Sequence, residues 1–319
     1  GAAYFLLSKE DTKTTILTKE RNFAVPNIDQ VHKVFIANRN GESVTLERKP
    51  NHWQLNGKYR ANPNPVQILL NTIQKVKIKY TPANAATQNI INDIATNNIK
   101  VEIYDKNNQP LSVYYVGGTT NDELGTHMIK EGAETPFVTY LPGFEGGLRV
   151  RYSPRERDWR DKAIFREQLQ AIESVSVEYP KQKNKSFKIE RENGTFSLKP
   201  FYENTPKAKK PTPSGQIERY LIGYERLIAE SFSNEYEHKD SIKQLLPFSI
   251  IRLKTKGEPQ KVVRLHPIIK RAKNGQMILD DSGTAIIEKY FADVNGEDFM
   301  LIQQLIFGKI LWSYDSFFL

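Results

Sequence analysis

The sequence contains no cysteine among its 319 residues, so disulfide scaffolds, thiol nucleophiles and cysteine-ligated metals are excluded. No internal run approaches the roughly 18 to 20 apolar residues that a membrane-spanning helix needs. Five histidines are present, and no two share a metal-ligand spacing such as H-E-x-x-H or H-x-H. A G-x-S-x-G nucleophile elbow and a phosphate loop ending in G-K-[ST] are also missing. We therefore predict no cofactor, no metal and no catalytic residue that the sequence alone can name.

The composition is that of a folded protein with a positive charge. Hydrophobic residues make up 39% of the chain and charged residues 26%, and a length of 319 residues favours two domains. The formal net charge of +9 favours acidic partners. Because the charges are spread along the chain and not gathered in one block, we expect no nucleic acid among those partners.

The first residues of the sequence differ from everything that follows. Residues 2–7 (AAYFLL) are all apolar, and Ser8, Lys9, Glu10 and Asp11 come directly after them. This pattern is typical of the end of a membrane-spanning helix followed by a polar stop. We therefore expect residues 1–21 to be the stump of an N-terminal anchor and a tether, with a short buried terminal strand as the alternative.

Regular turn signals predict a hairpin-rich fold. Asn-Gly pairs, which suit two-residue hairpin turns, start at residues 40, 56, 193, 274 and 295. Alternating apolar and polar residues predict strands over 31–36, 43–48, 99–104 and 111–116. Helical spacing appears at Val66, Leu69, Leu70, Ile73 and Val76, and again at Ile90, Ile91 and Ile94.

The second half of the chain repeats the first. Residues 44–55 (VTLERKPNHWQL) align without a gap with residues 187–198 (FKIERENGTFSL), so that Arg48 corresponds to Arg191. Residues 203–216 expand the second copy with a Pro- and Lys-rich segment, which we expect to be an exposed loop, more simply a connector than a binding element. The predicted fold is α+β, with two tandem, internally duplicated modules, 22–162 and 163–319, each of antiparallel hairpin strands packed with one or two helices.

The densest charged feature is residues 149–161 (RVRYSPRERDWRD), where arginines stand beside aromatic residues. Guanidinium groups next to aromatic rings bind phosphate, anionic lipid or the carboxylates of a partner. The candidate partner-binding residues are Arg149, Arg151, Tyr152, Arg155, Arg157, Trp159 and Arg160. Glu156, Asp158 and Asp161 lie among them, so internal ion pairing between structural residues is the simpler interpretation.

Six stretches together resemble an uncharacterised family of envelope proteins from Bacteroides-type bacteria that carry a numbered domain of unknown function, of the 4340 series. The stretches are FAVPNIDQVHKVFIA, WQLNGKY, VYYVGGTT, GTHMI, GFEGGLRVRY and DWRDKAIF. The resemblance is clearest over residues 23–165. It implies an N-terminal membrane anchor and a body on the periplasmic side of the cytoplasmic membrane. Some relatives are encoded near transporter components of the gliding-motility type. The resemblance supplies no catalytic residues.

Three functional hypotheses follow. The first is a non-enzymatic, membrane-anchored periplasmic binding or scaffolding protein, with an envelope protein such as a transporter subunit as its partner. The second is an envelope hydrolase or glycan-processing enzyme with paired carboxylates as acid and base, for which the nominees are Glu145, Asp158 and either Asp280 or Asp281. The third is a binder of small ligands or anionic polysaccharide, suggested by the positive charge.

Overall fold

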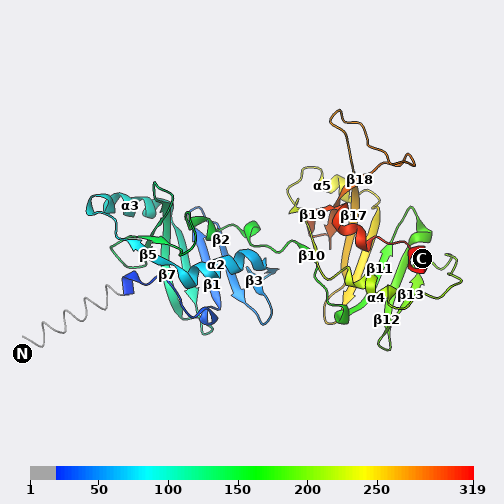
Figure 1. Cartoon of the computed structure of the whole chain (residues 1–319), viewed down its shortest axis with the longest axis horizontal. Helices are drawn as coiled ribbons and strands as arrows, with labels where there is room; N and C mark the ends of the chain where they lie inside the picture. The colour runs from blue at the N-terminus through cyan, green and yellow to red at the C-terminus, as the bar shows by residue number, and fades with distance from the viewer. Residues whose placement is uncertain (1–18) are drawn as a thin grey trace, which may run out of the picture. The chain divides into compact units, whose positions relative to one another are not determined.

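The computed structural model describes residues 19–319, and the chain divides into two compact units, one ending at Asp161 and the other running from Lys162 to Leu319 (Figure 1). The predicted anchor, residues 2–7, lies outside the described residues. Each unit holds one large antiparallel sheet and a few short helices, which confirms the α+β class. The predicted modules divide between residues 162 and 163, and the compact units divide one residue earlier.

The first unit is built on a sheet of nine strands, and each strand is antiparallel to its neighbours. In spatial order the strands are β4 (Tyr59–Arg60), β3 (Trp53–Leu55), β2 (Ser43–Arg48), β1 (Lys33–Asn38), β6 (Ile99–Tyr104), β7 (Pro110–Thr119), β8 (Thr126–Lys130), β9 (Phe137–Tyr140) and β5 (Lys77–Tyr80). The four predicted strands fall on β1, β2, β6 and β7 and are confirmed. Asn56 and Gly57 both have positive φ, 51° and 67°, as the predicted Asn-Gly turn requires, and Lys58 completes the connection between β3 and β4.

Two helices accompany this sheet. In α2 (Pro63–Lys75) the predicted apolar stripe is buried, and the side chain of Asn62 caps the helix by accepting a hydrogen bond from the backbone N of Asn64. In α3 (Asn84–Asn97), by contrast, Ile94 is the buried residue, and no side chain caps the N-terminus. Ile94 packs onto Gly117 of β7, where an added Cβ would lie 2.6 Å from its Cγ1. A glycine is therefore required where α3 meets the sheet.

The core of the first unit is mainly aliphatic. Alternate residues of β1, β2 and β6 point inward, among them Val34, Ile36, Leu46 and Val101, each with no exposed surface. Three aromatic side chains complete this core in a chain of edge-to-face contacts: Phe23 meets Tyr114, and Tyr114 meets Tyr152.

The second unit is built on a sheet of eight strands, also antiparallel throughout. In spatial order they are β13 (Thr195–Pro200), β12 (Phe187–Glu192), β11 (Ile172–Glu178), β16 (Ser249–Thr255), β17 (Lys261–Ile269), β18 (Ile287–Val294), β19 (Asp298–Gln303) and β15 (Ser231–Phe232). A separate pair joins β10 (Ala163–Phe165) to β14 (Leu227–Ile228). The helices are α4 (Gln216–Ile222), α5 (Lys239–Lys243) and α6 (Gln304–Phe307).

Two irregular segments extend from this unit. Residues 201–215 contain no helix or strand and are mostly exposed, which confirms the predicted loop between the strands and α4. Residues 270–286 form a long arm between β17 and β18, drawn in brown in Figure 1. Isolated bridges pair Arg271 with Met277 and Leu279 with Ala285 along the arm.

The core of the second unit is rich in aromatic side chains. Phe187, Tyr220 and Phe317 make mutual edge-to-face contacts with ring centroids 4.9 to 5.3 Å apart. Trp312 lies 5.4 Å from Tyr220 and 5.0 Å from Phe317. The short 3-10 turns η6 (Gly308–Ile310) and η7 (Tyr314–Phe318) carry part of this cluster. The last residues of the chain are thus a structural part of the second core.

The strand order is the same in both units. If the eight shared strands are numbered along the chain, β3-β2-β1-β6-β7-β8-β9-β5 reads 3-2-1-5-6-7-8-4, and β13-β12-β11-β16-β17-β18-β19-β15 reads the same. Strand β4 is an additional edge strand of the first sheet. In both sheets the fourth shared strand along the chain, β5 or β15, therefore lies at the edge of the sheet beside the last strand.

Candidate functional site

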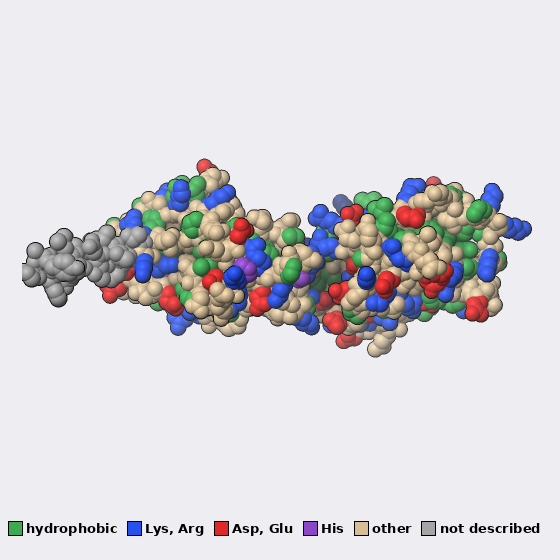
Figure 2. Space-filling view, turned by 90° about the horizontal axis from the view of Figure 1, so that it is seen from below, with side chains coloured by type: hydrophobic (Ala, Val, Ile, Leu, Met, Phe, Trp, Pro, Cys, Tyr) green, Lys and Arg blue, Asp and Glu red, His purple; other side chains and the backbone are tan. Residues whose placement is uncertain are grey.

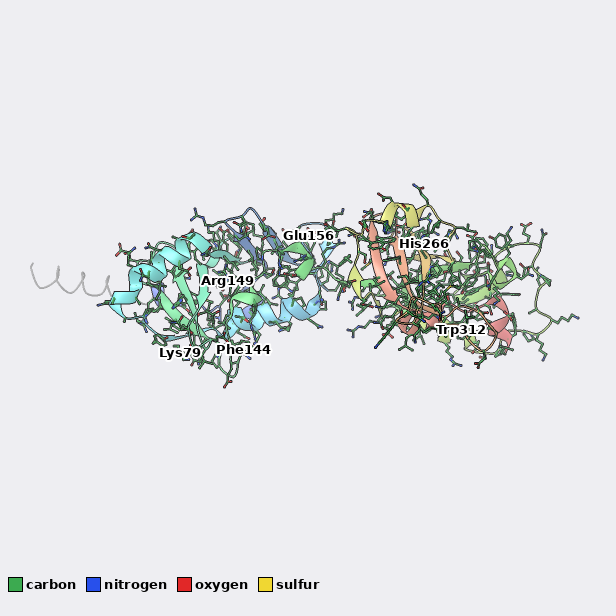
Figure 3. All side chains as sticks on the ribbon, turned by 90° about the horizontal axis from the view of Figure 1, so that it is seen from above. Lys79, Phe144, Arg149, Glu156, His266 and Trp312 are labelled. Carbon is green, nitrogen blue, oxygen red and sulfur yellow. The ribbon has the colours of Figure 1, made fainter. Side chains whose placement is uncertain are left out.

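The predicted arginine segment, residues 149–160, closes the first unit as two short 3-10 turns, η2 (Arg149–Arg151) and η3 (Glu156–Asp158). Glu156, labelled in Figure 3, accepts a hydrogen bond of 2.7 Å from the side chain of Asn56, which ties η3 to the turn between β3 and β4. The segment is thus fastened to the sheet of its own unit.

Two of the arginines point inward. Nη1 of Arg149, a residue labelled in Figure 3, donates to the carbonyl oxygens of Val116 (2.8 Å) and Gly117 (3.2 Å), and burial lowers its pKa. Nη1 of Arg151 donates to Oγ1 of Thr72 at 3.1 Å, and its guanidinium lies 4.0 Å from the ring centroid of Phe144. Both side chains hold the segment against the sheet and α2.

The two aromatic residues of the segment belong to the core. Tyr152 has no exposed surface, and its hydroxyl accepts a hydrogen bond from the hydroxyl of Tyr114 at 3.2 Å. Trp159 is also buried, and its Nε1 donates to the carbonyl oxygen of Ser153 at 2.8 Å. Both rings therefore pack in the core of the first unit, and their role in binding a partner stays a prediction.

The remaining arginines lie toward the surface. Nε and Nη2 of Arg155 each lie 3.0 Å from Oδ2 of Asp158, and Nε of Arg157 lies 3.9 Å from Oδ1 of the same carboxylate. Two guanidinium groups thus share one carboxylate, and a net positive charge remains at the surface. Arg160 places its guanidinium 3.7 Å from the ring centroid of Tyr59. The internal ion pairing predicted for this segment is present, and its role in binding a partner stays a prediction.

An apolar groove of about 380 Å³ lies beside the segment. Three of its side chains are large, hydrophobic and exposed: Val150 at 83%, Ile68 at 49% and Phe144 at 37%. The groove is lined by Pro65, Ile68, Phe144, Val150, Arg151, Ser153, Asp158 and Trp159. Sequence reasoning named the arginines on either side of Val150 and missed Val150 itself. The outward direction of Val150 depends on contacts that Arg149 and Arg151 make with residues far earlier in the chain, which the sequence pattern does not show.

The carboxylates nominated as acid and base lie in both units, and their pairing stays a prediction. Glu145 and Asp158 belong to the first unit and Asp280 and Asp281 to the second, and Asp158 is engaged by Arg155. The side chain of Asp280 accepts hydrogen bonds from Ser282 and from the backbone N of Thr284, which lower its pKa. Within residues 19–319, the carboxyl groups with a shifted pKa are shifted downward, each by hydrogen bonds that its carboxylate accepts, and an acid–base role for the nominees stays a hypothesis.

The described residues hold no group of three or more His, Asp or Glu side chains placed to bind a metal ion. Across the same residues, no helix has the length and apolar composition to cross a membrane. The segment DVNGED, which loosely resembles a calcium loop, is a hairpin turn in which Asn295 and Gly296 have φ of 56° and 74°. The predicted type of turn between β18 and β19 is therefore confirmed.

Comparison with known proteins gave one match. A family described as "Domain of unknown function (DUF4340)" matches residues 53–240, a range that covers the later part of the first unit and the earlier part of the second. Neither the curated proteins nor the solved structures contain a significant match.

Proposed function

The chain belongs to the DUF4340 family, a family without an assigned function, and from its surface we propose that it is a non-enzymatic binding or scaffolding protein of the cell envelope. The observation that carries this proposal is the exposed apolar groove around Val150. Val150 is 83% exposed and forms an apolar patch with Ile68 and Phe144, and exposed patches of this kind mark interaction sites. Burial of Val150 by a partner would contribute about 1.5 kcal/mol or more to binding.

The charge beside the groove indicates what kind of partner fits. Arg155 and Arg157 share the single carboxylate of Asp158, and Arg157 is 73% exposed in its side chain. We infer a protein partner that places an apolar side chain in the groove and a carboxylate near these two arginines. Complementary charge of this kind raises the rate of encounter and selects the partner, while the apolar contact supplies most of the affinity.

We further propose that the protein is held on the periplasmic side of the cytoplasmic membrane by an N-terminal helix, with a subunit of an envelope transport complex as the candidate partner. The apolar residues 2–7 and the polar stop behind them support this placement. Fractionation of cells that produce the full-length protein tests it. The protein should be in the membrane fraction, and external protease should digest it in spheroplasts; recovery in the soluble cytoplasm would exclude the anchor.

We also infer that the two units arose by duplication of one module, as the sequence repeat predicts. The shared strand order supports this inference. The matching contacts of one arginine in each unit support it as well. Nε of Arg48 donates to the carbonyl oxygen of Val31 (2.8 Å), and its Nη2 donates to the first carbonyl of the 3-10 turn η1 (Ile28–Gln30). Arg191 makes the same two bonds, to Ile172 (2.9 Å) and to the first carbonyl of η4 (Leu169–Ala171).

The test of the binding proposal is a charge placed in the groove. We expect Val150→Asp to remove a co-purifying partner from mildly crosslinked native membranes, because a carboxylate in the groove repels the acidic partner and forfeits the apolar contact. Leu305→Asp in the second unit is the matched control, since Leu305 is 91% exposed and lies outside the groove.

A photo-crosslinking residue at position 150 adds an independent readout of the same contact. We expect one crosslinked protein that is absent when the label stands at position 305. If Val150→Asp and Leu305→Asp retain the same partners, or if both labels give the same products, the groove is not the binding site. Circular dichroism of both variants controls for folding.

A further inference from the structure

A second pocket of the first unit, also of about 380 Å³, has a different chemistry from the groove. It lies between the loop that joins β2 to β3 and the first turns of α2, on residues that the arginine segment does not include. Arg48, Lys49 and Arg60 line it together with His52, while Trp53 and Leu70 contribute to an apolar wall. No carboxylate is among the lining residues, which all belong to the described part of the chain.

The positive charge of this pocket is only partly compensated. Lys49 pairs with Glu47 at 3.0 Å and Arg60 with Asp161 at 3.8 Å, and both carboxylates stand outside the lining. Arg48 donates its hydrogen bonds to backbone carbonyl oxygens, which carry no net charge. The pocket therefore keeps a positive potential, and such a potential in a hollow with apolar walls attracts anions.

The histidine of the pocket, His52, responds to the same charges. Burial lowers its pKa, and so do the charges of Arg60 and Lys49, which means that the pocket already disfavours an additional positive charge. Its Nδ1 lies 2.8 Å from Oδ1 of Asn51, an oxygen that can only accept. The tautomer of the neutral ring that makes this hydrogen bond carries its proton on Nδ1.

The N-terminus of α2 contributes no donors of its own. Pro63 and Pro65 lack a backbone N–H, and the backbone N of Asn64 is already bonded to the side chain of Asn62. An anion in this pocket would thus be held by side chains.

The second unit provides an internal comparison. In the aligned hairpin, Lys49 corresponds to Glu192 and His52 to Thr195, although Arg48 and Arg191 make the same contacts. Glu192 accepts a hydrogen bond from Lys199, so this position of the second hairpin is acidic. The backbone carbonyls that hold the arginine occupy corresponding positions in both units, whereas the residues that make the first pocket basic have no basic counterpart in the second hairpin.

We propose that the pocket at Lys49, His52 and Arg60 is a binding site for a small anion, a carboxylate or phosphate carried on a ring-sized body that packs against Trp53 and Leu70. The size agrees, because about 380 Å³ lies at the lower end of the range for small-ligand sites. Arg60 is 45% exposed in its side chain, and Lys49 is 36% exposed, so both are accessible from solvent. This site is separate from the apolar groove.

Calorimetric titration of the full chain with glucuronate, glucose 6-phosphate and neutral glucose tests the proposal. We expect at least one charged sugar to bind with a Kd of about 1 mM or below, and glucose not to bind. Binding should weaken at least about fivefold when the ionic strength rises from about 0.05 M to about 0.5 M. The carboxylate and phosphate probes show which anion the pocket takes.

The double variant Lys49→Glu with His52→Thr gives the first hairpin the chemistry of the second. We expect it to weaken binding at least about tenfold, and Arg60→Ala to weaken it to a smaller extent. Lys181→Glu, an equal charge change on an exposed residue of the second unit, should leave binding within about twofold. Val150→Asp should also leave binding unchanged, which separates this proposal from the one above. The proposal is overturned if no charged probe binds at about 10 mM, if glucose binds equally well, or if the double variant binds like the parent.

Discussion

The first unit covers its sheet with a long helix, whereas the second uses a short helix and a cluster of aromatic rings. Helix α2 has 13 residues and buries Val66, Leu69, Leu70 and Ile73. Helix α4, which follows the corresponding hairpin, has seven residues. The space beside it is filled by the rings of the second core and by the final 3-10 turns of the chain. The same strand order can thus be stabilised by two different covering layers, because a sheet needs apolar area buried on its face and not a particular element.

The second difference concerns charge. In the first unit Lys130 is largely buried, and burial lowers its pKa to about 8. In the second unit Lys199 is exposed, and its pKa is raised by hydrogen bonds to Glu192 and Glu190. The first unit therefore carries a partly buried charge on Lys130 that opposes folding at neutral pH, whereas the ion pairs of Lys199 stabilise its charged form.

The largest expected effect tests the aromatic layer. Phe317 is fully buried and contacts Phe187, Tyr220 and Trp312. We expect Phe317→Ala to lower the free energy of unfolding of the second unit by about 3 to 5 kcal/mol, through lost apolar contact and an unfilled cavity. Hydrogen exchange read by mass spectrometry in increasing urea should show the loss in peptides of the second unit and not of the first.

The matched control is Leu305→Ala, because Leu305 is 91% exposed and the change should cost less than about 0.5 kcal/mol. If Phe317→Ala has as small an effect as the control, the final turns are not part of the second core. The contrast between a helical and an aromatic covering layer would then be wrong.

A smaller effect tests whether Arg48 and Arg191, which make matching contacts, stabilise their two units equally. We expect Arg48→Met and Arg191→Met each to destabilise their own unit by about 2 kcal/mol, since each leaves two backbone carbonyl oxygens without their charged donor. Urea unfolding followed by peptide-resolved hydrogen exchange measures both. If Arg48→Met leaves the free energy of unfolding unchanged while Arg191→Met lowers it, the two arginines do not have equivalent roles. Arg155→Met removes a charge from a surface ion pair and is the control for lost charge alone.

The smallest effect tests the difference in internal charge. Lys130 has a pKa of about 8 in the folded protein and 10.5 as its ordinary value, so between these limits the unfolded chain binds more protons. The stability of the first unit should therefore rise as the pH increases from about 8 toward 10. Lys130→Met should remove this rise and add about 1 to 2 kcal/mol at pH 7, a range reduced to allow for the partial exposure of the amine.

A Trp312→Phe background leaves Trp53 and Trp159 as the tryptophans, both in the first unit, so that fluorescence during urea unfolding reports on that unit. The second unit, followed by its own peptides, should not show the rise. A flat pH profile in the parent protein would mean that Lys130 is solvated in the folded state.

Much of the fold could be predicted from the sequence because its signals are local. The Asn-Gly pair at residue 56 requires positive φ at both positions, and the alternation over 43–48 sets which face of β2 is buried. Packing against distant residues is not local, so it escaped prediction. Trp159 was named from its place among the arginines, and the sequence did not show that its indole is buried and donates to the carbonyl oxygen of Ser153.

The two surface sites could not be predicted for the same reason: their residues are brought together by contacts that are distant in sequence. The exposure of Val150 could not be predicted, because the side chain of Arg149 is directed inward by hydrogen bonds to the carbonyl oxygens of Val116 and Gly117. These two residues lie more than thirty positions earlier in the chain. Likewise, Lys49 and Arg60 are separated in sequence, and the return of the chain through β3 and β4 brings them to one pocket. Composition indicated a basic protein, and Figure 2 shows Lys and Arg side chains on both units; the topology decides which of them share a pocket.

Helix α3 shows how unevenly mutation can act on this fold. Ile94 is its buried residue and rests on Gly117, where any side chain would collide with it. Substitutions at these two positions should therefore be accepted only together, as a correlated pair in evolution. The exposed remainder of α3 is free to drift in sequence and in length, and in the second unit the helix that follows the corresponding edge strand, α5, has only five residues.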